Sequence, residues 1–83
     1  MSLHINITGF GEIQRHLPQD ICLTVAEDSV TVLTLFSELS RCYPKAIHAL
    51  ERCACAVDDV MLNRQSILST CCTLVLLSPV AGG

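Results

Sequence analysis

The sequence ends in two glycines, and this ending is the feature best suited to chemistry. Gly82-Gly83 would present a carboxylate with no side chain near it. A carboxylate becomes a good electrophile only after activation, for instance as an acyl-adenylate, and a glycine backbone can enter a narrow channel without a side-chain clash. The sequence therefore predicts a tail whose carboxyl group reacts inside another protein. An ending with no role is the alternative.

The remaining polar residues do not form a convincing catalytic or metal site. The sequence has no phosphate-binding loop, so any ATP that activates the tail must be bound by a partner. His4, His16 and His48 are dispersed and show no catalytic-triad pattern. Asp58-Asp59 fits a turn better than a metal site, because no further oxygen ligands follow in register. We therefore expect no metal and no bound cofactor.

The cysteines are unusually frequent, with six in 83 residues. In a reducing compartment, cysteine usually behaves as a small buried hydrophobe. Cys53 and Cys55 would face the same side of a strand, which allows half a metal site, but no Cys-x-x-Cys pair exists and core packing is preferred. Cys71-Cys72 would point to opposite faces, and a redox or persulfide role there is the alternative to packing.

Composition indicates one small globular domain. Apolar residues make up 51% of the chain, mean hydropathy is +0.51, and net charge is −3. The five fixed cations are scattered, which argues against a nucleic-acid partner. No apolar run reaches the roughly 18 residues of a membrane helix, and residues 1–4 lack the features of a signal peptide. We therefore expect a cytoplasmic protein without a membrane partner.

Hydrophobic periodicity predicts two strands in the first third of the chain. Leu3, Ile5 and Ile7 alternate with polar residues, and Gly9-Phe10-Gly11 would end that strand. Residues 21–25 alternate in the same way and are expected to pair antiparallel with the first strand. The polar stretch between them predicts a loop, with a helical turn near residues 12–16 left open.

The main helix is expected between Thr31 and Tyr43. Thr31, or Ser29 as the weaker alternative, would cap its first turn, and Pro44 would stop it. Its apolar residues recur with helical spacing and predict one buried face. These residues are Val32, Leu35, Phe36, Leu39 and Tyr43.

The second half of the chain predicts three further strands. Residues 53–57 and 60–62 would flank the turn at Asp58-Asp59. Residues 73–77 are continuously apolar, as in a central strand covered on both faces. Residues 45–52 leave a short helix open, and residues 63–69 predict a loop or a single tight helical turn.

One helix on a mixed sheet gives an α+β fold. The predicted domain covers residues 1–77, and residues 78–83 would form a flexible tail. The exposed sheet face and Val80 are expected to supply an apolar docking contact for a partner.

Several segments together resemble the MoaD/ThiS sulfur carriers, and most closely MoaD, the small subunit of molybdopterin synthase. These segments are Phe10-Gly11-Glu12, Thr31-Val32, Tyr43-Pro44, the strand–Asp58-Asp59–strand unit and the ending at residues 77–83. The likeness covers the whole chain and implies a β-grasp (ubiquitin-like) fold. The sequence departs from the family pattern at Ser78, usually proline, at Ala81, usually serine or threonine, and at residues 69–72, usually an acidic turn.

The resemblance also implies a role for the tail. A ubiquitin-activating-type enzyme (MoeB-like) would use ATP to adenylate Gly83, and a sulfur donor would convert the adenylate to a thiocarboxylate. The large synthase subunit (MoaE-like) would then receive the tail and pass its sulfur to the precursor of molybdopterin, the organic part of the molybdenum cofactor. The chain would not be catalytic alone. The arm threaded into the partner would comprise Ser78, Pro79, Val80, Ala81 and Gly82.

Other functions stay open at this point. The chain could carry sulfur for thiamine or another sulfur-containing product. It could instead be a ubiquitin-like modifier joined through Gly83 to lysines, or an interaction domain with an incidental tail.

Overall fold

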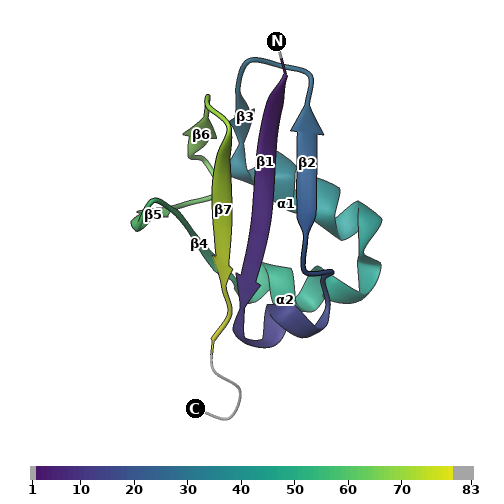
Figure 1. The fold of residues 1–83 in the computed structure, drawn as a ribbon. Helices are drawn as coiled ribbons and strands as arrows, with labels where there is room; N and C mark the ends of the chain where they lie inside the picture. The colour runs from purple at the N-terminus through teal and green to yellow at the C-terminus, as the bar shows by residue number, and fades with distance from the viewer. Residues whose placement is uncertain (1, 80–83) are drawn as a thin grey trace.

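A mixed five-stranded sheet with helices on one side forms the domain (Figure 1) in the computed structural model, which describes residues 2–79. The sheet order is β2-β1-β7-β4-β5, with β1 and β7 parallel and the other neighbours antiparallel. This arrangement confirms the predicted α+β, β-grasp fold. The strands are β1 (Leu3–Phe10), β2 (Ile21–Val25), β4 (Ala54–Val57), β5 (Val60–Leu62) and β7 (Cys72–Leu77).

The main helix begins and ends where the sequence predicts. The Thr31 hydroxyl accepts a hydrogen bond from the Thr34 amide at 3.2 Å, which caps the first turn. Pro44 follows the helix directly and starts a short 3₁₀ segment. The short helix left open at residues 45–52 and the turn near residues 12–16 are both present. The helical segments are η1 (Gly11–Arg15), α1 (Val32–Cys42), η2 (Pro44–Ala46) and α2 (Ile47–Arg52).

The hydrophobic core lies between α1 and the sheet. Four of the five predicted helix residues are buried, and Tyr43 packs half-buried at the edge. They meet alternate residues of β1 and β7, because successive side chains of a strand point to opposite faces. The strand residues of this layer include Leu3, Ile5, Ile7, Leu74 and Leu76.

The prediction that residues 73–77 are covered on both faces is wrong. Leu74 and Leu76 are fully buried, but Thr73 is exposed and Val75 and Leu77 are only half-buried. In Figure 1, α1 and α2 lie behind the sheet and η1 lies beyond the end of β1, so no helix of residues 2–79 covers the other face. The continuous apolar run of residues 73–77 therefore arises because the open face of β7 is itself partly apolar, and not because both faces are buried.

Residues 63–69 were predicted as a loop or a tight turn, and residues 63–66 form such a turn, in which the Ser66 amide donates to the Asn63 carbonyl at 3.1 Å. The prediction missed a second, two-stranded sheet that pairs β3 (Val30–Thr31) with β6 (Ile67–Leu68). Strands of two residues are too short to show a periodicity, so no local pattern predicts them. The same segment satisfies the first turn of α1, because Val32 and Leu33 donate their amides to the Ser66 and Arg64 carbonyls, each at 3.0 Å.

The β4–β5 hairpin turns on two aspartates, as predicted. Val57 pairs with Val60, and the residues between them, Asp58 and Asp59, have φ of +50° and +65°. Two successive residues in the left-handed region are characteristic of a type I′ hairpin turn.

No three His, Cys, Asp or Glu side chains within residues 2–79 are grouped to hold a metal ion.

The thiols at the start of β4 belong to the core, as predicted. Cys53 and Cys55 are buried, and all six cysteines are free. Burial raises the pKa of both thiols, and the Ser78 hydroxyl opposes part of the shift at Cys53.

Replacing Asp59 with glycine should stabilise the protein. Relief of the left-handed strain, worth about 1–2 kcal/mol for a non-glycine residue, outweighs the roughly 0.4–1 kcal/mol of extra unfolded-chain entropy. We expect the free energy of unfolding to rise by about 0.5 kcal/mol in urea denaturation. Asp20→Gly is the control, since Asp20 has no positive φ and its glycine variant should only lose stability. A loss in both variants would contradict the strain assigned to Asp59.

The buried thiols predict a loss of stability at alkaline pH. Their folded-state pKa values are raised, so above about pH 8.5, where an unfolded cysteine titrates, the unfolded chain releases protons that the folded state retains. The thiol contribution is complete below that pH and falls as pH rises. Urea denaturation at pH 7 and about pH 9.5 should show the loss, and Cys55→Ala should reduce the pH dependence. An unchanged pH dependence in Cys55→Ala would contradict it.

Candidate functional site

The tail leaves the sheet from its central strand. β7 ends at Leu77, which lies beside Phe10 at the end of β1. Parallel strands end at the same edge of a sheet, so the chain departs next to η1 (Figure 1). We call Ser78 and Pro79 the tail root. The rest of the predicted arm and its carrier, Val80, Ala81, Gly82 and Gly83, lies outside the described residues and stays a prediction.

The first residue of the predicted flexible tail is bonded to the domain. The Ser78 amide donates to the Phe10 carbonyl at 3.0 Å. The Ser78 hydroxyl accepts from the Ile13 amide at 2.8 Å and lies 3.4 Å from the Cys53 sulfur. Ser78 is therefore half-buried against η1, whereas Pro79 is exposed.

Gly11 provides the surface on which Ser78 rests. Its φ is +83°, a conformation that side chains resist. A Cβ on Gly11 would also lie 3.1 Å from both the Cβ and the carbonyl oxygen of Ser78. From the sequence, this glycine is expected to end the first strand. The strand runs through Phe10, and Gly11 lies against Ser78 of the tail root.

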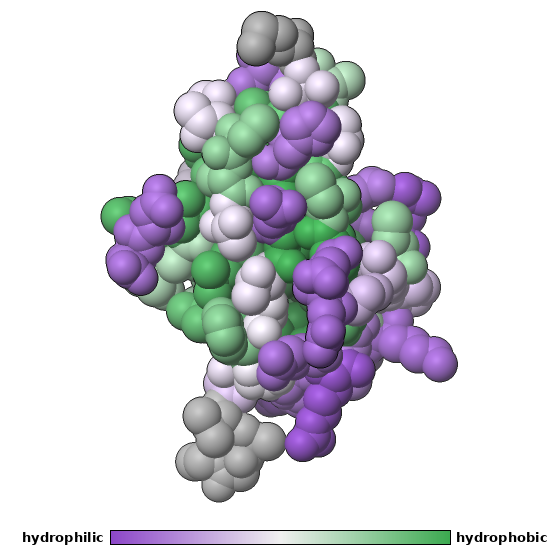
Figure 2. Space-filling view, viewed as in Figure 1, coloured by the Kyte–Doolittle hydropathy of each residue, from purple (hydrophilic) through white to green (hydrophobic). Residues whose placement is uncertain are grey.

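An apolar surface adjoins the tail root on the open side of the sheet. Phe10 and Met61 are 50% and 59% exposed, and cross-strand registers align Phe10 and Ala54 with Leu77. Figure 2 shows hydrophobic side chains spreading over this face toward the end of β7. An exposed apolar surface of this kind is typical of a protein contact. The open-face patch comprises Phe10, Ala54, Met61, Val75 and Leu77.

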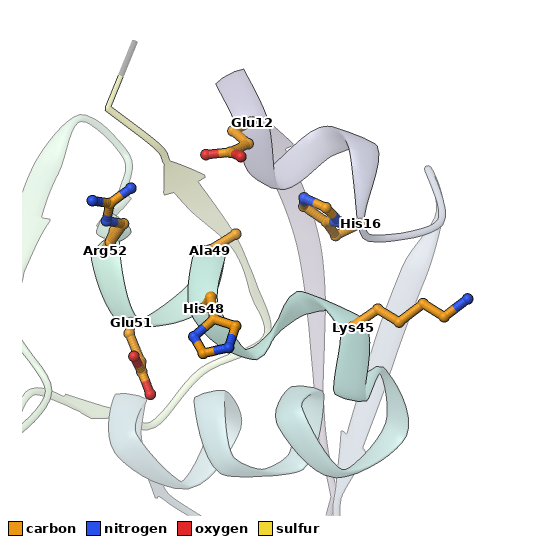
Figure 3. Close-up of a pocket in the computed structure, with 7 residues that line it drawn as sticks. All are labelled: Glu12, His16, Lys45, His48, Ala49, Glu51 and Arg52. Atoms are coloured by element: carbon orange, nitrogen blue, oxygen red, sulfur yellow. The ribbon is translucent and has the colours of Figure 1, made fainter. Parts of the chain in front are cut away.

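A polar pocket lies on the other side of η1, between η1 and α2 (Figure 3). It has a volume of about 450 Å³ and mixes both signs of charge. Its side chains point in different directions, and Lys45 extends away from the others. The pocket therefore does not look like a catalytic centre. Its lining is Glu12, His16, Lys45, His48, Ala49, Glu51 and Arg52.

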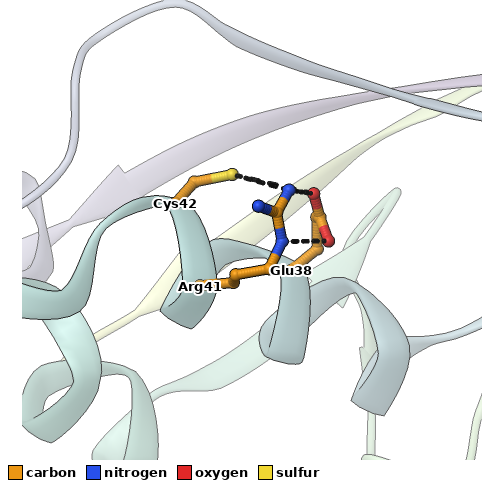
Figure 4. A network of polar contacts seen from close by, with 3 residues as sticks. All are labelled: Glu38, Arg41 and Cys42. Atoms are coloured by element: carbon orange, nitrogen blue, oxygen red, sulfur yellow. Dashed lines mark hydrogen bonds and ion pairs between the residues drawn. The ribbon is translucent and has the colours of Figure 1, made fainter.

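The exposed side of α1 carries a charged group (Figure 4). Arg41 forms a two-point ion pair with Glu38, with one contact from its Nε at 3.2 Å. Hydrogen bonding from Arg41 lowers the pKa of the Glu38 carboxyl. The Cys42 thiol lies 3.7 Å from the same carboxylate. Both ionic side chains are well exposed, so the pair adds little stability.

The described part of the chain contains no helix long and apolar enough to cross a membrane. The described residues place a hydrogen-bonded tail root beside an exposed apolar surface.

Comparison with known proteins agrees with this geometry. The model of the ThiS family matches residues 10–83. No curated protein gives a significant sequence match. The solution structure of the Haloferax volcanii HVO 2177 protein has a TM-score of 0.78 at 17% identity, covering 99% of this chain and 88% of that one.

A second similar structure is the crystal structure of SAMP1 from Haloferax volcanii. Its TM-score is 0.73 at 14% identity, covering 96% of this chain and 99% of that one. Likeness at such low identity shows the fold, and the family match extends the result to the sequence. The chain therefore belongs to the ThiS family of small ubiquitin-like sulfur carriers, which are not catalytic alone and depend on an activating enzyme of the ubiquitin-activating type.

Proposed function

We propose that this chain is the sulfur-carrying small subunit of a molybdopterin synthase, with Gly83 as the residue that bears the sulfur. The observation that carries the proposal is the extent of the family match, which runs through Gly82-Gly83 to residue 83. A match confined to the folded domain would have supported only a β-grasp scaffold.

The proposed cycle uses the tail as a substrate. A carboxylate oxygen of Gly83 attacks the α-phosphate of ATP bound by a MoeB-like enzyme, and pyrophosphate leaves. Hydrosulfide released by a sulfur donor then attacks the acyl carbon, a C–S bond forms, AMP leaves, and loss of the sulfur-bound proton gives the thiocarboxylate. The glycines at residues 82 and 83 suit a narrow site. ATP and the acid–base groups belong to the partners, and this chain supplies the carboxylate.

The open-face patch supports a docking step before the tail reacts. A partner that covers Phe10 and Met61 lies directly beside the tail root. Burying these side chains would stabilise the complex by about 25 cal/mol per Å² of apolar area, less the cost of association. The MoaE-like large subunit and the MoeB-like enzyme both need the tail, so we assign both to this face.

The recipient of the sulfur is assigned from the whole-chain likeness to MoaD. The chain, with 83 residues, is longer than a minimal thiamine-type carrier, which supports the assignment to molybdopterin synthesis. The name of the matching family keeps a carrier for thiamine as the second candidate. Incubating the charged carrier with a molybdopterin synthase large subunit and, separately, with a thiazole synthase decides between them by which one discharges the thiocarboxylate.

The thiols support a cytoplasmic location. All six cysteines are free, and two of them pack in the core. Proteins of a reducing compartment keep their cysteines in this state.

The carrier function predicts a defined change in mass. Incubation with a competent activating enzyme, ATP and a sulfur donor should replace one oxygen of the terminal carboxylate with sulfur, and intact-mass spectrometry should detect it. Deleting Gly82-Gly83 should abolish the change while leaving the circular dichroism spectrum intact. Sulfur on the deleted form, or none on the full chain, would overturn the proposal.

The docking role predicts that a charge on the open face weakens partner binding. Met61→Asp should reduce the affinity for the large subunit about tenfold or more, because the carboxylate would be desolvated in the interface. Leu33→Asp is the matched control, since Leu33 is 55% exposed, close to the 59% of Met61, but lies on α1. Calorimetric titration measures both affinities. Equal losses in the two variants would show that binding does not use this face.

A further inference from the structure

We propose that Ser78 is a positioning residue for tail activation. Its hydrogen bonds to Phe10 and Ile13, which we call the clasp, hold the start of the arm at a fixed point beside η1. Only the residues beyond Ser78 would then enter a partner. The inference rests on the proposed function of the tail. It assigns Ser78 a part in holding the arm in place of the expected part in threading it.

The contacts of Ser78 come from two directions. Its amide continues the sheet pairing by donating to Phe10, and its hydroxyl accepts from Ile13, 65 residues away in the sequence. One hydrogen bond through the backbone and one through the side chain of Ser78 together fix the position and the direction of the chain at this residue. The Cys53 Sγ lies 3.4 Å from the Ser78 hydroxyl oxygen.

The hydroxyl of Ser78 serves as the cap of η1. Ile13 lies in the first turn of η1, where amides usually lack a partner inside the helix. Phe10, the residue before η1, offers no capping side chain. Ile13 is fully buried, so water would not readily replace Ser78 as the acceptor. The clasp is therefore costly to open.

A fixed root sets the reach of the arm. The five residues 79–83 can span at most about 18 Å when fully extended. An arm of this length starting at a fixed point keeps its carboxylate at a high effective concentration in a docked partner. Releasing Ser78 would lengthen the arm and broaden its directions, so productive entry would become rarer at the same docking affinity.

The test compares two serines with matching hydrogen bonds. Ser78→Ala removes the hydroxyl that accepts from the Ile13 amide. Ser66→Ala removes the hydroxyl that accepts from the Asn63 amide, a hydrogen bond of 3.0 Å that does not involve the tail. Both variants should lose some thermal stability. Rates of thiocarboxylate formation with the activating enzyme should separate them.

We expect Ser78→Ala to lower kcat/KM about tenfold, with the dissociation constant for the docked enzyme unchanged, and Ser66→Ala to match the wild type. Equal rates in all three proteins, or equal losses in both variants, would overturn the clasp. A wild-type chain that is never charged would instead overturn the proposed function, so the two failures are distinguishable.

Hydrogen exchange provides a readout that does not depend on partners. The Ile13 amide should exchange slowly in the wild type and in Ser66→Ala, and much faster in Ser78→Ala. Unchanged protection of Ile13 in a folded Ser78→Ala protein would show that the hydroxyl does not hold η1, and would overturn the proposal.

Discussion

The parallel pairing of β1 and β7 is the constraint on which the site depends. It joins the first and last strands of the domain from Ile5–Cys72 to Phe10–Leu77. Parallel strands run in the same direction, so the exit of β7 must lie beside the turn that follows β1. That turn is η1, which provides both Gly11 and Ile13 to Ser78. The tail root is thus joined to the centre of the sheet, the part of a domain that opens least often.

The same sheet is covered on one face only, and this asymmetry leaves the open-face patch exposed. The covered side is closed by α1, whose start is held by the β3–β6 sheet and by loop carbonyls. Arg64 also lies on that side, where its guanidinium donates to the Leu50 and Cys53 carbonyls, both at 3.1 Å. The Cζ atom of the same guanidinium lies 3.9 Å from the centroid of the Phe36 ring. On the open side, exposed polar residues such as Asn6 and Thr73 confine the apolar surface to the end near the tail.

Periodicity predicted the elements whose burial follows from local pattern. The spacing of Val32 to Leu39, the Thr31 cap and the Pro44 stop each act within a few residues, and the structure confirms them. The β3–β6 pairing and the bonds of Ser78 depend on residues far apart in the sequence, which no local pattern encodes. The run at residues 73–77 misled for a related reason: an apolar face that stays exposed has the same composition as a buried one.

Serine at position 78 gives the tail root a different kind of stiffness from the proline usual in the family. Proline restricts φ by its ring alone and has no amide to donate, so its rigidity is independent of the domain. The Ser78 amide can donate a hydrogen bond to the Phe10 carbonyl, which a proline could not, and the Ser78 hydroxyl also accepts one from the Ile13 amide. Rigidity then depends on η1, on the glycine beneath it and on the packing around Cys53. In this chain the position of the tail root is therefore a property of the folded domain, and a change in η1 would alter the hydrogen bonds that hold Ser78.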